Sequence, residues 1–252
     1  DSDLDLMVNT IGSGTRLFVN DGHGQFRDTT QQAGLDRPSG AMSVSLADID
    51  RDGDLDLYVA NYRSTTLRDE PDTRFRLKRE GAATIITAVN ERPLTEPDLV
   101  GRFSLDPATG IVEHGEPDVL YRNNGRGVFS RVPWDQGDFV DTQGRPSAVP
   151  FDWGLCGLLR DLDGDGSPDL YVCNDFASPD RVWMNRGDGR FRSIPDAAIR
   201  TTSRFSMGVD IADIDRDGDD DILVLDMLSR DHRRRQVQTG SGKAPMVEGN
   251  SG

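Results

Sequence analysis

Three short segments of the chain hold aspartates in a spacing that suits a metal ion. Each contains the pattern D-x-D-x-D-G-x-x-D, at residues 48–56, 161–169 and 213–221. Calcium takes roughly six to eight oxygen ligands, and alternate Asp residues in a tight loop can point their carboxylates at one centre. Glycine at position 6 permits the sharp turn, and the carbonyl of position 7 adds an oxygen. The pattern therefore predicts three Ca²⁺ sites, against the plainer alternative of solvated acidic turns.

The predicted ligands occupy the same five positions in each loop: the Asp side chains at positions 1, 3, 5 and 9, and the main-chain carbonyl at position 7. In chain order they are Asp48, Asp50, Asp52, the carbonyl of Asp54 and Asp56; Asp161, Asp163, Asp165, the carbonyl of Ser167 and Asp169; and Asp213, Asp215, Asp217, the carbonyl of Asp219 and Asp221. An EF-hand would need a bidentate Glu at position 12 and flanking helices, but position 12 is Val59, Val172 or Val224. These valines lie in runs rich in β-branched and aromatic residues, so each loop should join two β-strands.

A second motif alternates with the acidic loops. Segments 17–26, 120–129 and 182–191 each place an apolar residue and an aromatic residue ahead of an Asn, which is followed by G-x-G-x-Phe. Alternating apolar residues around an Asn- and Gly-rich turn are typical of a β-hairpin.

The acidic loops and the hairpins together form a repeat of 52 residues, and two insertions near 62–117 and 134–153 account for the longer spacing elsewhere. The opening DSDLDLMVN matches the second half of an acidic unit, with Asp1 and Asp5 at loop positions 5 and 9. Each unit supplies four short strands. Four-stranded units with a period of about 40–50 residues are typical of β-propeller blades.

The predicted fold is therefore all-β, built from four-stranded antiparallel propeller blades. The strands expected over residues 1–236 fall into groups of 3, 4, 4 and 2, or about three and a half blades. Closed propellers usually have about four to eight blades, so we expect a partial propeller that self-associates or is completed by further blades. Residues 237–252 are polar and rich in Gly and Ser, and we expect a flexible tail there.

The composition argues against some classes of function. The 252 residues include 44 acidic and 29 basic side chains, a net charge of −15, which disfavours a general affinity for nucleic acid. No run approaches the roughly 18 apolar residues of a membrane-spanning helix, and none is expected. The chain shows no signal peptide, but it opens inside a repeat, so this says nothing of the parent protein.

The first insertion carries other residues capable of chemistry. Glu91, Glu96, Asp98, His114 and Glu116 lie there, but nothing in their spacing pairs them for acid–base catalysis. We expect a solvated loop packed by its single apolar run. Such a loop could also carry partner specificity, because binding residues concentrate in long loops on rigid scaffolds.

The tryptophans and cysteines leave alternatives open. Trp134 and Trp153 flank the second insertion, where an exposed, sugar-stacking role stays open, whereas Trp183 aligns with the hairpin aromatics and should be core. Cys156 and Cys173 fall on neighbouring strands within one residue of register. They form either a disulfide, if they face the same side, or a free buried pair. No CxxC or Cys/His cluster indicates zinc.

Taken together, the motifs resemble the FG-GAP/VCBS repeat family, whose blades build the propellers of integrin α-subunits and of many secreted bacterial proteins. The segments FDWGLCGLLRDLDGDGSPDLYVCNDFASPDRVWMNRGDGRF and RFSMGVDIADIDRDGDDDILVLDMLSRDHRRR also resemble bacterial relatives of cartilage acidic protein, which often carry a C-terminal ASPIC/UnbV domain. In this family the Asp-rich loops bind Ca²⁺, which the resemblance implies for the three loops here. The first repeat lacks the Asp residues of positions 1 and 3, and no ASPIC/UnbV segment follows residue 236.

The motifs and the resemblance predict a calcium-binding β-propeller module for interaction or adhesion, with structural Ca²⁺, outside the cell or in the periplasm. Repeated metal loops without a catalytic constellation argue against an enzyme. The alternative is a carbohydrate-binding or polysaccharide-acting propeller that uses insertion 62–117. The sequence does not tell whether the partner is a protein or a glycan.

Overall fold

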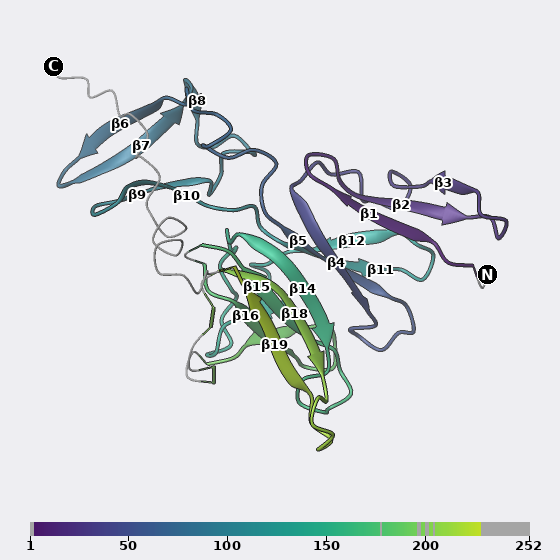
Figure 1. Cartoon of the computed structure of the whole chain (residues 1–252). Coiled ribbons are helices and arrows are strands. Elements are labelled where there is room, and N and C mark those ends of the chain that lie inside the picture. Colours follow the sequence, from purple (N-terminus) through teal and green to yellow (C-terminus); the bar gives the residue numbers. More distant parts are fainter. Residues whose placement is uncertain (1–2, 177, 196–197, 200–201, 204, 228–252) are drawn as a thin grey trace. The chain divides into compact units, whose positions relative to one another are not determined.

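The computed structural model describes residues 3–176, 178–195, 198–199, 202–203 and 205–227. Asp1 and the predicted tail over 237–252 lie outside the described residues. The described part of the chain consists of strands, turns and loops (Figure 1). It contains no helix, and therefore none that is long and apolar enough to span a membrane. It divides into two compact units, one over 1–64 and 116–227 and the other over 65–115.

The first unit consists of antiparallel sheets that follow one another along the chain. In order, they are β1 (Leu6–Thr10), β2 (Gly14–Asn20) and β3 (Phe26–Asp28); β4 (Ala41–Ala47), β5 (Asp56–Asn61), β11 (Val119–Asn123) and β12 (Phe129–Val132); β14 (Gly154–Arg160), β15 (Asp169–Asn174), β16 (Arg181–Asn185) and β17 (Phe191–Ser193), joined by β13 (Phe139–Val140); and β18 (Ser206–Ala212) with β19 (Asp221–Asp226). The predicted grouping of strands is confirmed except for β13. This short strand comes from the second insertion and pairs parallel to β17.

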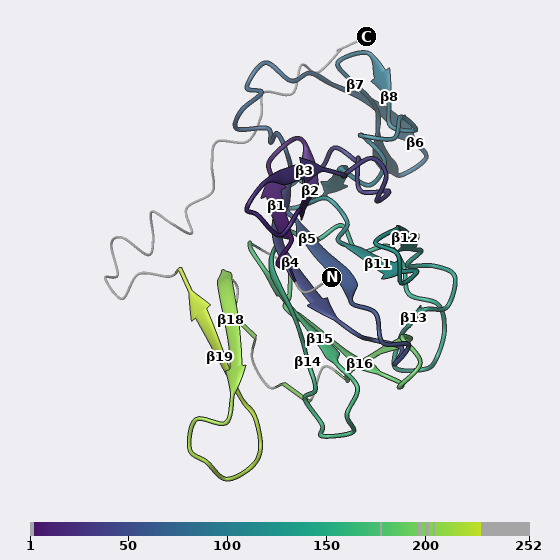
Figure 2. The same ribbon diagram turned by 90° about the vertical axis from the view of Figure 1, so that its right-hand side faces the viewer.

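Hydrophobic cores lie between successive sheets because strand residues alternate between the two faces. On β5, Leu57 and Val59 belong to a cluster with Leu17 of β2, whereas Tyr58 faces a cluster that includes Leu170 of β15. Every residue of β5 and of β15 is therefore buried. The first strands of successive sheets also lie side by side, β4 with β14 and β14 with β18 (Figure 2). Face-to-face packing of consecutive sheets confirms the predicted partial propeller.

A buried aspartate ties β5 to the start of β11. The Asp118 carboxylate accepts hydrogen bonds from the Tyr58 hydroxyl at 2.6 Å and from the Asn61 N–H at 2.7 Å. The Asn61 side chain in turn donates to the carbonyl of Pro117 at 2.9 Å. Burial raises the pKa of Asp118 to about 7, because the desolvated carboxylate is penalised more than these hydrogen bonds compensate.

The first insertion is a compact unit, so the expectation of a solvated loop with one short element is wrong. It contains β6 (Phe75–Glu80), β7 (Ala83–Val89), β8 (Arg92–Pro93), β9 (Phe103–Asp106) and β10 (Gly110–Glu113). Its core includes Phe75, Ile86, Val89, Leu99 and Phe103. Ile86 and Val89 lie in the apolar run, but Phe75 and Phe103 stand singly between polar neighbours, a half-buried pattern that a search for apolar runs overlooks.

The tryptophans are buried, so the exposed sugar-stacking role considered for two of them is wrong. Trp134 is 5% exposed and Trp153 is 7% exposed. Trp134 stacks on Phe139 with ring centroids 3.9 Å apart, and Trp153 packs on Tyr62 at 4.7 Å. Trp183 is 2% exposed and belongs to the core, as predicted.

Cys156 and Cys173 lie directly opposite each other on β14 and β15. A register shift beside Gly154 brings them into line. Both are free thiols, and burial raises the pKa of Cys173. The structure therefore shows the free pair, at positions whose register also suits a cross-strand disulfide.

Candidate metal centres in the acidic loops

Each acidic loop connects two antiparallel strands, as predicted. The loops join β4 to β5, β14 to β15 and β18 to β19. Position 9 is the first residue of the second strand in every case, and its partner across the ladder directly precedes position 1: Ala47 pairs with Asp56, Arg160 with Asp169 and Ala212 with Asp221. The ladder therefore brings the two ends of the acidic pattern together.

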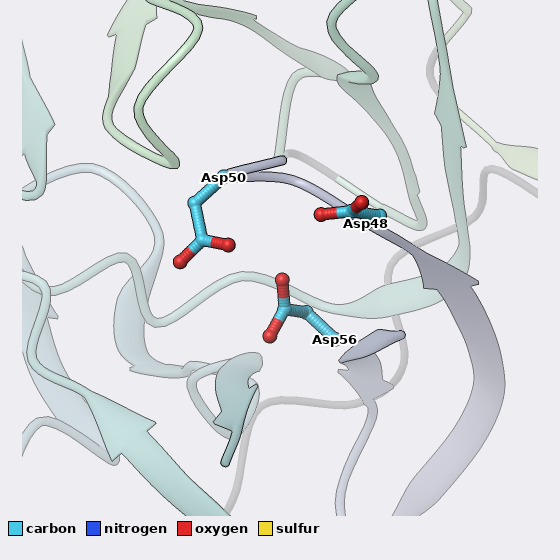
Figure 3. Close-up of side chains that lie close together, drawn as sticks. All are labelled: Asp48, Asp50 and Asp56. Atoms are coloured by element: carbon cyan, nitrogen blue, oxygen red, sulfur yellow. The ribbon is translucent and has the colours of Figure 1, made fainter. Parts of the chain in front are cut away.

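Three carboxylates converge in each loop. They belong to positions 1, 3 and 9, and one oxygen of each lies within 4.8 Å of the others. Figure 3 shows this arrangement in the first loop, where the side chains point towards a common space. The three groups are Asp48, Asp50 and Asp56; Asp161, Asp163 and Asp169; and Asp213, Asp215 and Asp221.

The aspartates at position 5 do not belong to these groups. Each accepts a hydrogen bond from the N–H two residues further on, at 3.0 Å for Asp52, 2.7 Å for Asp165 and 2.9 Å for Asp217. These contacts stabilise the turn that leads to position 7. A ligand role for position 5 and for the carbonyls of Asp54, Ser167 and Asp219 stays a prediction.

The backbone of the loops turns through two left-handed residues. Glycine at position 6 has a positive φ in all three loops, as the pattern predicted. The left-handed conformation at position 4 was not predicted. Arg51 and Arg216 have φ of 64° and 67° there, and Gly164 has 76°. Arginine in this conformation costs about 1 kcal/mol or more, and such strain is commonly retained at functional sites.

Two features of the first loop suit a bound cation. The Asp50 Oδ1 atom is buried and has no hydrogen-bond partner among the described residues. Burial and the nearby charges of Asp52 and Asp48 raise the pKa of Asp50. A cation held by the three converging carboxylates would supply the missing partner and offset this repulsion. Oxygen-only ligands of this kind suit a hard ion such as Ca²⁺.

The second loop has the same electrostatic character. Burial, together with the charges of Asp163 and Asp165, raises the pKa of Asp169 to about 6. The carboxylate nevertheless accepts hydrogen bonds from the N–H of Leu162 at 2.9 Å and from the N–H of Asn185 at 2.7 Å. The side chain is thus held in place while its charge remains incompletely balanced.

The Asn of each hairpin is a functional residue that the sequence interpretation treated only as part of a turn. The N–H of Asn123 donates to Asp56 at 2.9 Å, as the N–H of Asn185 does to Asp169. In the first sheet the N–H of Asn20 makes the equivalent bond to Asp5. Each Asn side chain also donates to the carbonyl that precedes this Asp. The recurrence of Asn at one place in every hairpin was the available signal.

The candidate catalytic residues of the first insertion contact local partners. Glu91 pairs with Arg76, and both Glu96 and Asp98 pair with Arg92. The remaining two are also engaged, with the His114 ring 2.7 Å from the Ser104 hydroxyl and Glu116 accepting the N–H of Gly40 at 2.6 Å. Within the described residues, three of the carboxylates are therefore engaged in ion pairs and the fourth accepts a backbone hydrogen bond.

Comparison with known proteins agrees with these repeats. Residues 1–59 and 161–224 match the FG-GAP-like repeat family. The chain is 25% identical over 197 residues to cartilage acidic protein 1 of Mus musculus and 25% identical over 210 residues to that of Homo sapiens. These alignments cover 74% and 75% of the chain but only 29% of each relative.

A solved structure also shows a distant likeness. It is that of an Agrocybe aegerita lectin that recognises non-reducing terminal N-acetylglucosamine. The match has 17% identity and a TM-score of 0.28, and it covers 88% of this chain and 60% of the lectin. Such a loose superposition carries no functional argument. The family match and the repeated loop geometry agree with each other: the matched segments resemble FG-GAP-like repeats, and the chain is similar in sequence to cartilage acidic protein 1.

Proposed function

We propose that the chain is a calcium-binding β-propeller module in which structural Ca²⁺ holds the acidic loops closed and the blades support interaction or adhesion. The observation that carries this proposal is the convergence of the same three carboxylates, at positions 1, 3 and 9, in all three loops. The family resemblance adds that such loops bind Ca²⁺ in related proteins. Calcium here acts on folding rather than on a reaction.

The role of the ion would be to offset charge repulsion among the carboxylates of each loop. The three loops carry 5, 4 and 6 acidic residues within nine positions each. Like charges at such short range repel one another and oppose closure of the strand pair. An ion bound only by the folded state stabilises it by roughly 2.7 kcal/mol per site at a hundredfold excess over Kd.

The location and the partner belong to the same proposal. Loops of this kind suit extracellular calcium, where modules bind at roughly 10⁻⁴–10⁻³ M, so the chain would act outside the cell or in the periplasm. Its partner would be a protein or a glycan, engaged by a non-catalytic surface. Further blades or a second copy would cover the terminal sheets, whose exposed edges favour association.

Isothermal titration calorimetry with Ca²⁺ tests the proposal. We expect saturable binding approaching three ions per chain, and loss of one ion in the Asp163→Asn variant. Asp135→Asn removes the same charge from an exposed residue outside the loops and should leave the stoichiometry unchanged. Absence of saturable binding up to about 10 mM Ca²⁺, well above the range of extracellular modules, would refute the proposal.

A further inference from the structure

The first two acidic loops are in direct contact. Arg51, at position 4 of the first loop, donates from Nη2 to the carbonyl of Asp165 at 3.1 Å and to the hydroxyl of Ser167 at 2.7 Å. Its neighbours in the first loop, Asp50 and Asp52, are predicted ligands, and so are the two residues that it contacts. One side chain therefore links the ligand-bearing backbone of two loops that are more than a hundred residues apart in sequence.

A second link joins the same two loops. The side chain of Asn185 donates to the carbonyl of Ile49 in the first loop at 2.8 Å. The N–H of the same residue donates to the Asp169 carboxylate in the second loop at 2.7 Å. Asn185 is 5% exposed, so this bridge is shielded from competing water.

We propose that Arg51 couples the first two metal sites, so that an ion in either loop raises the affinity of the other. This inference rests on the proposed calcium binding. An ion held by Asp48, Asp50 and Asp56 would order the turn that carries Arg51. The ordered guanidinium would then hold Asp165 and Ser167 in place before the second ion arrives, which lowers the entropy lost on binding.

Coupling of this kind is reciprocal. If the first ion strengthens binding of the second, the second strengthens binding of the first by the same factor. Typical coupling between linked sites lies between about 5-fold and 150-fold in affinity. Arg51 adopts a left-handed conformation that Gly164 adopts with less strain in the next loop.

The third loop supplies a matched control. Arg216 occupies the same loop position with nearly the same φ, and its side chain is exposed and makes no hydrogen bond or ion pair within the described part of the chain. The third loop contacts the end of β14 instead through Asp220, whose carboxylate binds Arg160 at 2.6 Å. Arg51 contacts two predicted ligand residues of the neighbouring loop, whereas this contact joins two residues that are not predicted ligands, so it should transmit less from one site to the other.

Hydrogen–deuterium exchange with and without Ca²⁺ tests the coupling in proteins that carry Asp163→Asn, which disables the second site. In that background we expect calcium to slow exchange of amides 164–167 at least about 5-fold, through occupation of the first loop. Adding Arg51→Gly should remove most of this slowing and leave only what the Asn185 bridge transmits, while adding Arg216→Gly should preserve it. Glycine suits the backbone at both positions, so neither change should impair folding.

Two results would contradict the inference in different ways. Equal slowing of amides 164–167 with and without Arg51 would overturn the coupling but leave calcium binding intact, provided that amides of the first loop become protected. A first loop whose amides do not respond to Ca²⁺ would overturn the proposed function and the coupling together.

Discussion

The strands that follow the second and third acidic loops have similar sequences but very different surroundings. On β15, Tyr171 is 3% exposed and Cys173 is fully buried, whereas their counterparts on β19, Leu223 and Leu225, are 53% and 62% exposed. β15 pairs with a hairpin strand and packs against a neighbouring sheet on each face, while β19 pairs with β18 alone among the described strands. The strand sequence specifies β structure, and the neighbouring blade supplies the burial.

The acidic loops show the same contrast. Asp169 is 1% exposed and its two carboxylate oxygens accept separate N–H groups, whereas Asp221 is exposed and accepts the N–H of Ile214 at 3.1 Å. The geometry of the three carboxylates is nevertheless maintained in both loops. Local sequence is therefore sufficient to form the cluster, and the hairpin adds rigidity and burial to it.

The largest expected effect separates the two strands directly. Leu170→Ala on β15 leaves a cavity at a fully buried position and should lower the free energy of unfolding by about 2–5 kcal/mol. Ile222→Ala at the matching position of β19, 43% exposed, should cost less than about 1.5 kcal/mol. Urea unfolding in calcium buffer measures both. Equal losses would show that β19 is as well packed as β15.

A pH effect should arise in the buried region. The pKa of Asp118 is about 7 when folded, above its ordinary value, so the native state holds a proton that the unfolded state releases. Its contribution favours the folded state at pH 5 and is lost as pH rises through about 7. Titration of this group should lower the free energy of unfolding of the wild type by about 2–3 kcal/mol between pH 5 and pH 8. Asp118→Asn should not show this decrease.

Urea unfolding of wild type and Asp118→Asn at several pH values, in saturating calcium, checks this expectation. The exposed Asp135→Asn variant controls for a general effect of charge. Parallel pH profiles for wild type and Asp118→Asn would show that this carboxylate is not the source.

A smaller loss of stability is expected when the hairpin asparagines are replaced, and its size should again depend on burial. Asn185→Ala removes three side-chain hydrogen bonds: a buried one to the carbonyl of Ile49 and two part-buried ones, to the carbonyl of Pro168 and from the N–H of Gly187. Loss of the buried partner should cost about 1–3 kcal/mol. Asn20→Ala removes three exposed side-chain bonds of 3.2 Å, to the carbonyl of Leu4 and from the N–H groups of Gly22 and Gly24. Water can replace these partners, so the loss should be less than about 1 kcal/mol. Thermal unfolding compares the pair, and an equal loss would argue against a special role for the buried bridge.

Much of the fold was predictable because the same strand and turn motifs recur in each repeat. The D-x-D-x-D-G-x-x-D loops and the Asn-Gly hairpins predicted the strands on either side and their grouping. Local backbone geometry follows from local sequence, so glycine at position 6 correctly indicated the turn. Register was harder, because the shift beside Gly154 that aligns Cys156 with Cys173 has no separate sequence signal.

The remaining features depend on contacts between distant segments. The unit over 65–115 forms from singly placed apolar residues such as Phe75 and Phe103, whose edge-to-face contact at 5.0 Å joins strands far apart in sequence. No pattern in the sequence indicates that Arg51 contacts Ser167, which the folded structure shows. Burial of Trp134 and Trp153 likewise comes from packing that no local pattern encodes.

Thermal unfolding of the wild-type chain in EDTA and in millimolar Ca²⁺ tests the central claim most directly. Binding of about 2.7 kcal/mol per site should raise the melting temperature in Ca²⁺ by at least about 5 °C. Mg²⁺ at the same concentration should have a much smaller effect, because it prefers a smaller and more rigid octahedral shell. Identical melting temperatures in EDTA and Ca²⁺ would show that the acidic loops are not calcium sites that stabilise the blades.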